Sequence, residues 1–302
     1  MRFAAYLILA ATLVLWSGNW IVARWVRDDI APGVATVGRL LIALAVLTPL
    51  VWRDLLPRLR AFTARDWRIF ALLGFCGGGV HLSMQWLGLH YTTATSGTLF
   101  LSTTPIFILL LASPLLGERI VPRQWAGVLV SFLGVAAIAS GGDPRALATL
   151  RFNIGDLLAV ASMAMWALYT VVLRLRRDSL DTAQSIFMVC AIGLACMLPW
   201  LAWDLAHGAS ASLSPAGMLA VVYSALGSLL LAYAGWAYVV RRLGAARAGA
   251  TMHLMPAIGI VLAAIFLGER PAWFHFAGML LIIAGVTLST WRIRASTGAS
   301  SR

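Results

Sequence analysis

The chain has 302 residues, of which 61% are hydrophobic and only 11% are charged, and its formal net charge is +12. A soluble globular domain carries roughly 25% charged residues, and a soluble fold of this length has to cover itself with polar side chains that this sequence does not contain. The composition therefore excludes a soluble globular protein and predicts an integral membrane protein whose first partner is the lipid bilayer.

Ten stretches of the chain are long and apolar enough to cross a bilayer, which takes about 20 residues of helix. They cover residues 4–23, 34–52, 69–89, 96–116, 123–140, 154–173, 183–203, 215–238, 248–267 and 273–291. The connections between them are short, so the spans use most of the chain. We therefore predict an all-α integral membrane protein of ten transmembrane helices.

The positive charges, all of them arginines, lie almost entirely between the predicted spans. With the N-terminus inside, 17 arginines fall in cytoplasmic segments and 5 on the other side, while Arg39 lies within the second span. Cytoplasmic loops carry an excess of basic residues, so both termini are predicted to be cytoplasmic. The same rule explains the basic balance without a nucleic-acid partner. The use of arginine alone points to a GC-rich genome, so we expect a bacterial inner membrane.

The two halves of the chain match each other at an offset of 150 or 151 residues. Equivalent positions are Trp16 and Trp166, Pro49 and Pro199, Pro105 and Pro256, and the LGER blocks at 116–119 and 267–270. Each half, residues 1–146 and residues 147–302, holds five spans. An odd number makes the second half enter the membrane from the opposite side, so we predict two inverted five-helix repeats, a plan of secondary transporters.

Several short motifs occur in the same order in both halves. Each fourth span contains a proline and ends in Gly-Glu-Arg, and each fifth span contains Ala-Gly and Gly-Val. The segment Trp16–Trp20 (WSGNW) opens the first half, and Tyr91–Ser96 (YTTATS) precedes the fourth span. In these features the chain resembles the EamA-type members of the drug/metabolite transporter superfamily over nearly its whole length. The resemblance implies ten helices in two inverted repeats, and export of amino acids, related metabolites or toxic cations.

Polar side chains inside spans are candidates for binding a small-molecule substrate, because such groups are costly in hydrocarbon. Trp16, Asn19 and Trp20 share one face of the first span, and His81 and Gln85 share one face of the third. Either set contacts a solute, or the tryptophans mark the membrane interface and the polar groups bond between helices. Both interpretations stay open at this stage.

Arg39 is the one arginine placed within a span. It attracts a substrate carboxylate, extends its charged end to the membrane surface, or binds backbone carbonyl groups. Glu269, in the second LGER block, sits at a span end together with Arg270, and we interpret this pair and its first-half equivalent as helix-end anchors.

Prolines occupy equivalent positions in the fourth and ninth spans. Pro105 and Pro256 each remove a backbone hydrogen bond, and paired interruptions in two repeats point to a transport site or gate; the alternative is a simple kink. Ser102 and Thr103 precede Pro105 and either face the cavity or bond their own backbone. His253 lies three residues before Pro256, which places it beside a predicted break.

Aromatic residues recur in the sixth and eighth spans. Trp166 and Tyr169 lie in the sixth, and Tyr223, Tyr233 and Trp236 lie in the eighth. Together they predict an aromatic-lined cavity, which suits apolar or aromatic solutes and also suits a cation through cation–π contacts. Lipid-facing aromatics are the alternative for some of them.

We predict a secondary transporter that exports amino acids, aromatic or neutral, with a multidrug or organic-cation exporter as the alternative. An ATP-driven pump is excluded because the chain has no lysine for a phosphate-binding loop. An intramembrane serine hydrolase would need Ser96 as nucleophile and His253 as base, and no third orienting group is evident. A passive channel or structural membrane protein has no need of the inverted repeat.

No cofactor, metal or disulfide is expected, since the three cysteines (Cys76, Cys190 and Cys196) all lie inside spans. Matching small residues in the fifth and tenth spans would allow a homodimer.

Overall fold

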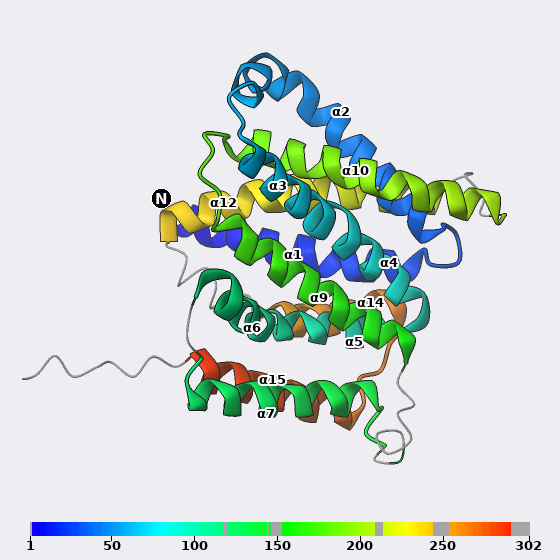
Figure 1. The fold of residues 1–302 in the computed structure, drawn as a ribbon. Coiled ribbons are helices and arrows are strands. Elements are labelled where there is room, and N and C mark those ends of the chain that lie inside the picture. Colours follow the sequence, from blue (N-terminus) through cyan, green and yellow to red (C-terminus); the bar gives the residue numbers. More distant parts are fainter. Residues whose placement is uncertain are drawn as a thin grey trace, which may run out of the picture.

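The computed structural model describes residues 2–117, 120–143, 145, 153–208, 214–243 and 254–290, and over these residues it is helical with no strand (Figure 1). The first half contains α1 (Arg2–Trp25), α2 (Pro32–Leu59), α3 (Ala64–Leu73), η1 (Gly74–Val80), α4 (His81–Tyr91), α5 (Ala94–Phe100), η2 (Leu101–Thr103), α6 (Thr104–Leu116) and α7 (Pro122–Ala139). The second half contains α9 (Ile154–Leu173), α10 (Thr182–Ala206), α11 (Pro215–Val222), η3 (Tyr223–Leu231), α12 (Ala232–Leu243), α14 (Met255–Leu267) and α15 (Trp273–Thr290).

These elements combine into ten membrane-crossing helices. Eight helices in the described part of the chain are long and apolar enough to cross a bilayer, and two shorter apolar ones follow at Met255–Leu267 and Trp273–Leu288. The predicted ten spans are therefore confirmed, with ends that differ mostly by a few residues. The ninth, predicted from residue 248, is described only from Met255, and the predicted boundary between the halves at residues 146 and 147 lies outside the described residues.

Local sequence explains where several helices begin. A capping box formed by Thr63 and Asp66 starts α3, and one formed by Asp181 and Gln184 starts α10. At the other end, α6 stops at Gly117 with φ 71° and α14 stops at Gly268 with φ 65°, a left-handed conformation that favours glycine. The two glycines are equivalent positions of the repeat, so the LGER blocks terminate equivalent helices.

The third span of each half contains a π-helical segment, η1 in the first and η3 in the second. Shifted by 150 residues, Gly74–Val80 falls inside Tyr223–Leu231, so the two wide turns are also equivalent positions of the repeat. Such turns are rare and are often found at functional sites. Glycines in η1 let α10 approach closely: a Cβ on Gly78 would lie 2.3 Å from the Val189 carbonyl oxygen. The run of glycines in the third span is thus a packing surface.

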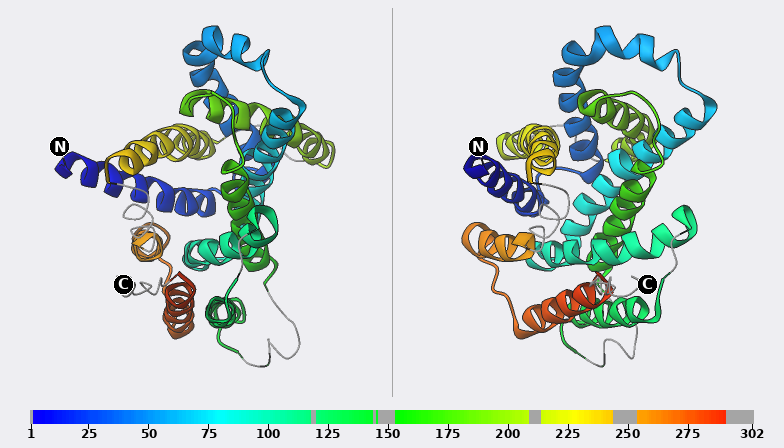
Figure 2. Two further views of the ribbon diagram at one scale, coloured as in Figure 1. Left: turned by 60° about the vertical axis from the view of Figure 1, so that its left-hand side comes forward. Right: turned by 90° about the vertical axis from the view of Figure 1, so that its left-hand side faces the viewer.

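The fifth and tenth spans, α7 and α15, lie side by side at one edge of the molecule (Figures 1 and 2). Their small residues allow this approach, because a Cβ on Gly134 would lie 2.5 Å from the Gly278 carbonyl oxygen and one on Gly285 would lie 2.4 Å from that of Gly127. These glycines are therefore engaged within one chain. They therefore do not support the homodimer, which stays a prediction.

Candidate substrate site

Six rings form a cluster where α1, α4, α9 and α12 meet, and we call it the ring cluster: Trp16, His81, Trp166, Tyr169, Tyr233 and Trp236. Trp166 stacks on Tyr169 with centroids 5.0 Å apart, and its ring lies 5.2 Å from His81. Tyr233 stands edge-on to both Trp16 and Trp166 at 5.8 Å, and Trp236 lies 5.4 Å from Trp16. Offset and edge-to-face pairs are the favourable ring geometries. Both halves of the chain contribute, so the cluster lies at the interface between the repeats.

Hydrogen bonds to neighbouring helices fix two of these rings. The Trp16 indole N–H donates to the Ser228 carbonyl oxygen in η3 at 3.1 Å. His81 Nδ1 lies 2.9 Å from the Ser162 carbonyl oxygen, which only accepts, so Nδ1 carries a proton. In the neutral ring this leaves Nε2 as an acceptor. The Ser162 hydroxyl donates back to the His81 carbonyl oxygen at 2.9 Å, which ties α4 to α9.

Arg39 lies beside the ring cluster and is buried, with 2% of its surface exposed. Tyr233, Cys190 and His81 are titratable side chains near it. Its Nε and Nη1 atoms have no hydrogen-bond partner among the described residues. A buried cation without a partner is costly, so this guanidinium is a candidate binding group for an anion.

A second polar group joins three helices one turn from His81. The Asn19 side-chain amide donates to Gln85 Oε1 at 3.1 Å, and the Ser224 hydroxyl donates to Asn19 Oδ1 at 2.5 Å. All three residues are buried. Asn19 and Gln85 therefore bond to each other across α1 and α4, the helix-to-helix alternative that the sequence left open.

Two of the predicted aromatic site residues, Trp20 and Tyr223, do not join the ring cluster. Trp20 is buried and packs against α5, where a Cβ on Gly97 would lie 2.6 Å from its ring. The Tyr223 hydroxyl donates to the Leu15 carbonyl oxygen at 3.0 Å, which fixes η3 to α1. Both side chains therefore hold helices together in this structure.

The fourth span changes geometry just before Pro105. The short 3-10 segment η2 ends there, and the Thr103 hydroxyl donates to the Phe100 carbonyl oxygen at 2.7 Å, so Thr103 bonds its own backbone. Ser102 is buried with no hydrogen-bond partner for its hydroxyl among the described residues.

Pro256 lies in the first turn of α14, and the neighbouring Met255 carbonyl oxygen accepts from Ser17 at 3.2 Å. Both prolines thus stand at helix starts, since Pro105 lies in the first turn of α6.

The hydrolase hypothesis paired Ser96 with His253. His253 lies outside the described residues. Ser96 instead approaches His275, with Oγ 3.4 Å from Nε2. The Ala272 backbone N–H donates to His275 Nδ1 at 2.9 Å, so the proton of the neutral ring is on Nε2. A ring that presents N–H to Ser96 cannot remove its proton.

Sequence reasoning missed three serines that orient this site, Ser162 and Ser224 through their hydroxyls and Ser228 through its backbone carbonyl oxygen. Ser162, Ser224 and Ser228 are isolated serines in apolar spans, a residue type that usually bonds its own backbone. One signal was available: Ser162 and Trp166 are four residues apart and so share a helix face.

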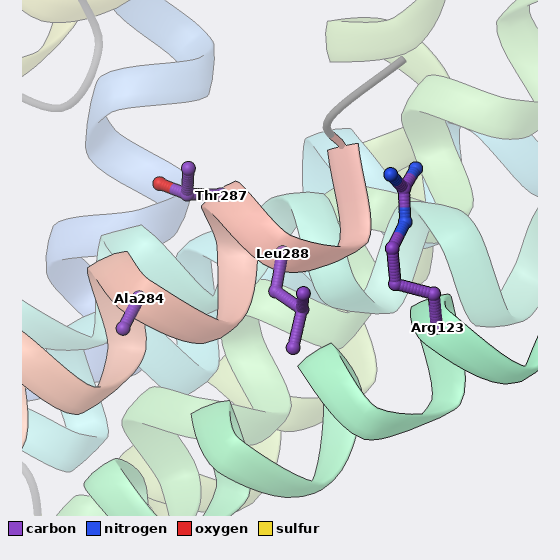
Figure 3. A pocket seen from close by; sticks show the side chains of 4 residues that line it. All are labelled: Arg123, Ala284, Thr287 and Leu288. Atoms are coloured by element: carbon purple, nitrogen blue, oxygen red, sulfur yellow. The ribbon is translucent and has the colours of Figure 1, made fainter. Parts of the chain in front are cut away.

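Two surface hollows lie away from the ring cluster. One of about 410 Å³ lies between the start of α7 and the end of α15 (Figure 3) and is lined by Arg123, Ala284, Thr287 and Leu288. The other, of about 720 Å³, lies on α2 and is lined by Ala45, Thr48, Pro49, Trp52 and Arg53. Neither gathers unpaired buried polar groups, so the ring cluster with Arg39 remains the candidate site.

Ten membrane helices in two inverted repeats, with aromatic and polar side chains at the interface of the repeats, define a membrane transporter. The chain matches the EamA-like transporter family over residues 3–140 and again over residues 153–291, and it belongs to that family.

Proteins similar to this chain include two that are named as a transporter or an exporter. An uncharacterized transporter of Archaeoglobus fulgidus is 26% identical over 96% of this chain and 98% of its own length. A probable terminal-alkyne amino-acid exporter of Streptantibioticus cattleyicolor is 29% identical over 93% of this chain and 91% of its own length. A solved crystal structure with 20% identity aligns with a TM-score of 0.60 over 96% of this chain and 98% of that one, which shows the shared fold.

Proposed function

We propose that this protein is a secondary transporter that exports neutral or aromatic amino acids across a bacterial inner membrane by alternating access, with both termini in the cytoplasm. The observation that carries the proposal is Arg39, a buried guanidinium next to the ring cluster, two of whose nitrogens have no hydrogen-bond partner among the described residues. The Streptantibioticus cattleyicolor relative named as a probable amino-acid exporter supports the same substrate class.

The chemistry of the site fits the three parts of an amino acid. The Arg39 guanidinium pairs with the carboxylate, since arginine presents N–H groups in a fork that matches it. The ring faces take an apolar or aromatic side chain. The acceptor at His81 Nε2 and the faces of Trp16 and Trp166 are available to the ammonium group.

An organic cation fits this site less well. The ring cluster alone would attract a cation, but Arg39 would repel it, and repulsion between like charges is strong where water is excluded. A carboxylate on the substrate would neutralise the buried charge of Arg39. A cation would instead place a second positive charge beside it. We therefore place amino-acid export before the organic-cation alternative.

Substrate analogues and an arginine variant test the proposal. In proteoliposomes, we expect an amino acid to compete for transport of a labelled one, and the amine that lacks its carboxylate not to compete. Arg39→Gln should lower transport by about tenfold or more, the loss expected when one charged hydrogen-bonding partner is removed.

Arg53→Gln is the matched control, because Arg53 lies on the same helix but is exposed. Equal competition by the amino acid and the amine, or full transport by Arg39→Gln, would remove the basis of the carboxylate assignment.

A further inference from the structure

The carboxylate of Glu269 links the two repeats at one end of the molecule. Glu269 follows α14 in the second repeat, and its partners lie at the start of α5 in the first. One carboxylate oxygen accepts from the Ala94 backbone N–H at 2.8 Å. The other accepts from the Thr95 backbone N–H at 2.8 Å and from the Thr95 hydroxyl at 2.7 Å. Three hydrogen bonds therefore converge on one side chain.

The start of α5 is a strong partner for a negative charge. The span that runs from Ala94 to Leu116 leaves its first backbone N–H groups without partners inside the helix, and the N-terminal end of a helix carries partial positive charge. The Thr93 hydroxyl accepts from the Ser96 backbone N–H at 3.0 Å. The Glu269 carboxylate accepts from the backbone N–H groups of Ala94 and Thr95. The cap of this first-repeat helix is thus completed by the second repeat.

The helices beneath this contact are tightly packed. Every residue of α5 is buried, whereas most residues of α6, the other part of the same span, are partly exposed. A Cβ on Gly97 would lie 2.6 Å from Trp20 of α1, and one on Gly259 of α14 would lie 2.5 Å from Thr98. Close contacts at glycines therefore join α5 to both α1 and α14.

We propose that the Glu269 carboxylate is a latch that holds this end of the transport pathway closed. For the pathway to open here, α14 has to move away from α5, and the three hydrogen bonds have to break. The distribution of arginines puts this end on the extracytoplasmic side. The inference rests on the alternating access of the proposed function, but not on the identity of the substrate. The repeat equivalent of Glu269 in the sequence is Glu118, which lies outside the described residues.

Cysteine accessibility measured without substrate tests the latch. Cys76, Cys190 and Cys196 are replaced by alanine, and Ala263→Cys is introduced as the reporter. Ala263 lies on α14, is 0% exposed and packs in one cluster with Ile21 and Ala94. A membrane-impermeant maleimide reaches this thiol only when α14 separates from its neighbours. The folded fraction of each variant is followed by size-exclusion chromatography.

Glu269→Gln should raise the labelling rate of the reporter by about tenfold or more, because a neutral amide forms weaker bonds to the helix start. Asp181→Asn is the matched control: Asp181 also caps a helix, accepting from the Gln184 N–H at 2.9 Å, but within its own helix start. It should leave the labelling rate unchanged.

Thr95→Val removes only the hydroxyl bond and provides a milder variant if Glu269→Gln does not fold; it should raise labelling by a smaller factor. Labelling at the parental rate in the folded variants would overturn the latch. If labelling rises as expected while amino acids are not transported, the latch stands and the substrate assignment falls.

Discussion

Gly78 and Gly79 are adjacent glycines in η1, and the structure predicts that changing Gly78 to alanine costs more stability than changing Gly79. A Cβ on Gly78 would lie 2.3 Å from the Val189 carbonyl oxygen, which belongs to the backbone of α10. A Cβ on Gly79 would lie 3.0 Å from the end of the Met197 side chain. A methionine side chain adapts to such a contact, whereas a helix backbone does not move without its neighbours.

The size of the effect follows from these distances. Carbon needs roughly 3.5 Å to its neighbour, so Gly78→Ala forces α10 back by about 1 Å. Overpacking of this kind costs about 1–3 kcal/mol. Alanine favours a helix over glycine by about 1 kcal/mol, but this gain is common to both variants. Gly78→Ala should therefore be less stable than Gly79→Ala by about 1–3 kcal/mol.

Unfolding in mixed micelles with increasing sodium dodecyl sulfate, followed by tryptophan fluorescence, measures this difference directly. Both positions are buried and lie in the same π-helical segment, so effects on local backbone preference are matched. Equal unfolding free energies for the two variants, or a less stable Gly79→Ala, would refute the packing of η1 against α10.

Two further predictions use the same unfolding assay. Asn19→Ala and Gln85→Ala should be non-additive, with a coupling of about 0.6–1.7 kcal/mol, the range for hydrogen bonds between membrane helices; additive losses would mean that the Asn19–Gln85 bond contributes nothing. Gly134→Leu should destabilise the single chain by about 1–3 kcal/mol, because the larger side chain forces α7 from α15. If that variant only dissociated a dimer and left the monomer equally stable, the packing of Gly134 on Gly278 in one chain would be wrong.

The membrane fold was predictable because its determinants are local or periodic. Apolar length defines each span, and the repeated LGER blocks fall where Gly117 and Gly268 terminate equivalent helices. The π-helical segments were not predictable, because a wide turn depends on the neighbouring helix. In η1 that neighbour is α10, which packs on Gly78.

The candidate site was predictable only in part. Trp16 and Trp20 share a helix face, yet Trp16 joins the ring cluster while Trp20 packs against Gly97, because one turn of helix brings a different neighbour. Spacing along one helix gives the direction of a side chain but not what lies opposite it. For the same reason, the sequence left the role of Arg39 open. The packing of α2 against the second repeat encloses it, and two of its guanidinium nitrogens have no hydrogen-bond partner among the described residues.

The central claim is that the interface of the repeats carries amino acids by alternating access, and counterflow in proteoliposomes tests it most directly. Uptake of a labelled neutral amino acid is measured with and without the same unlabelled amino acid inside the vesicles. We predict saturable uptake that preloading accelerates, and that is lost in Arg39→Gln but kept in Arg53→Gln. Uptake that does not saturate and does not respond to preloading, or transport of an organic cation in place of any amino acid, would contradict it.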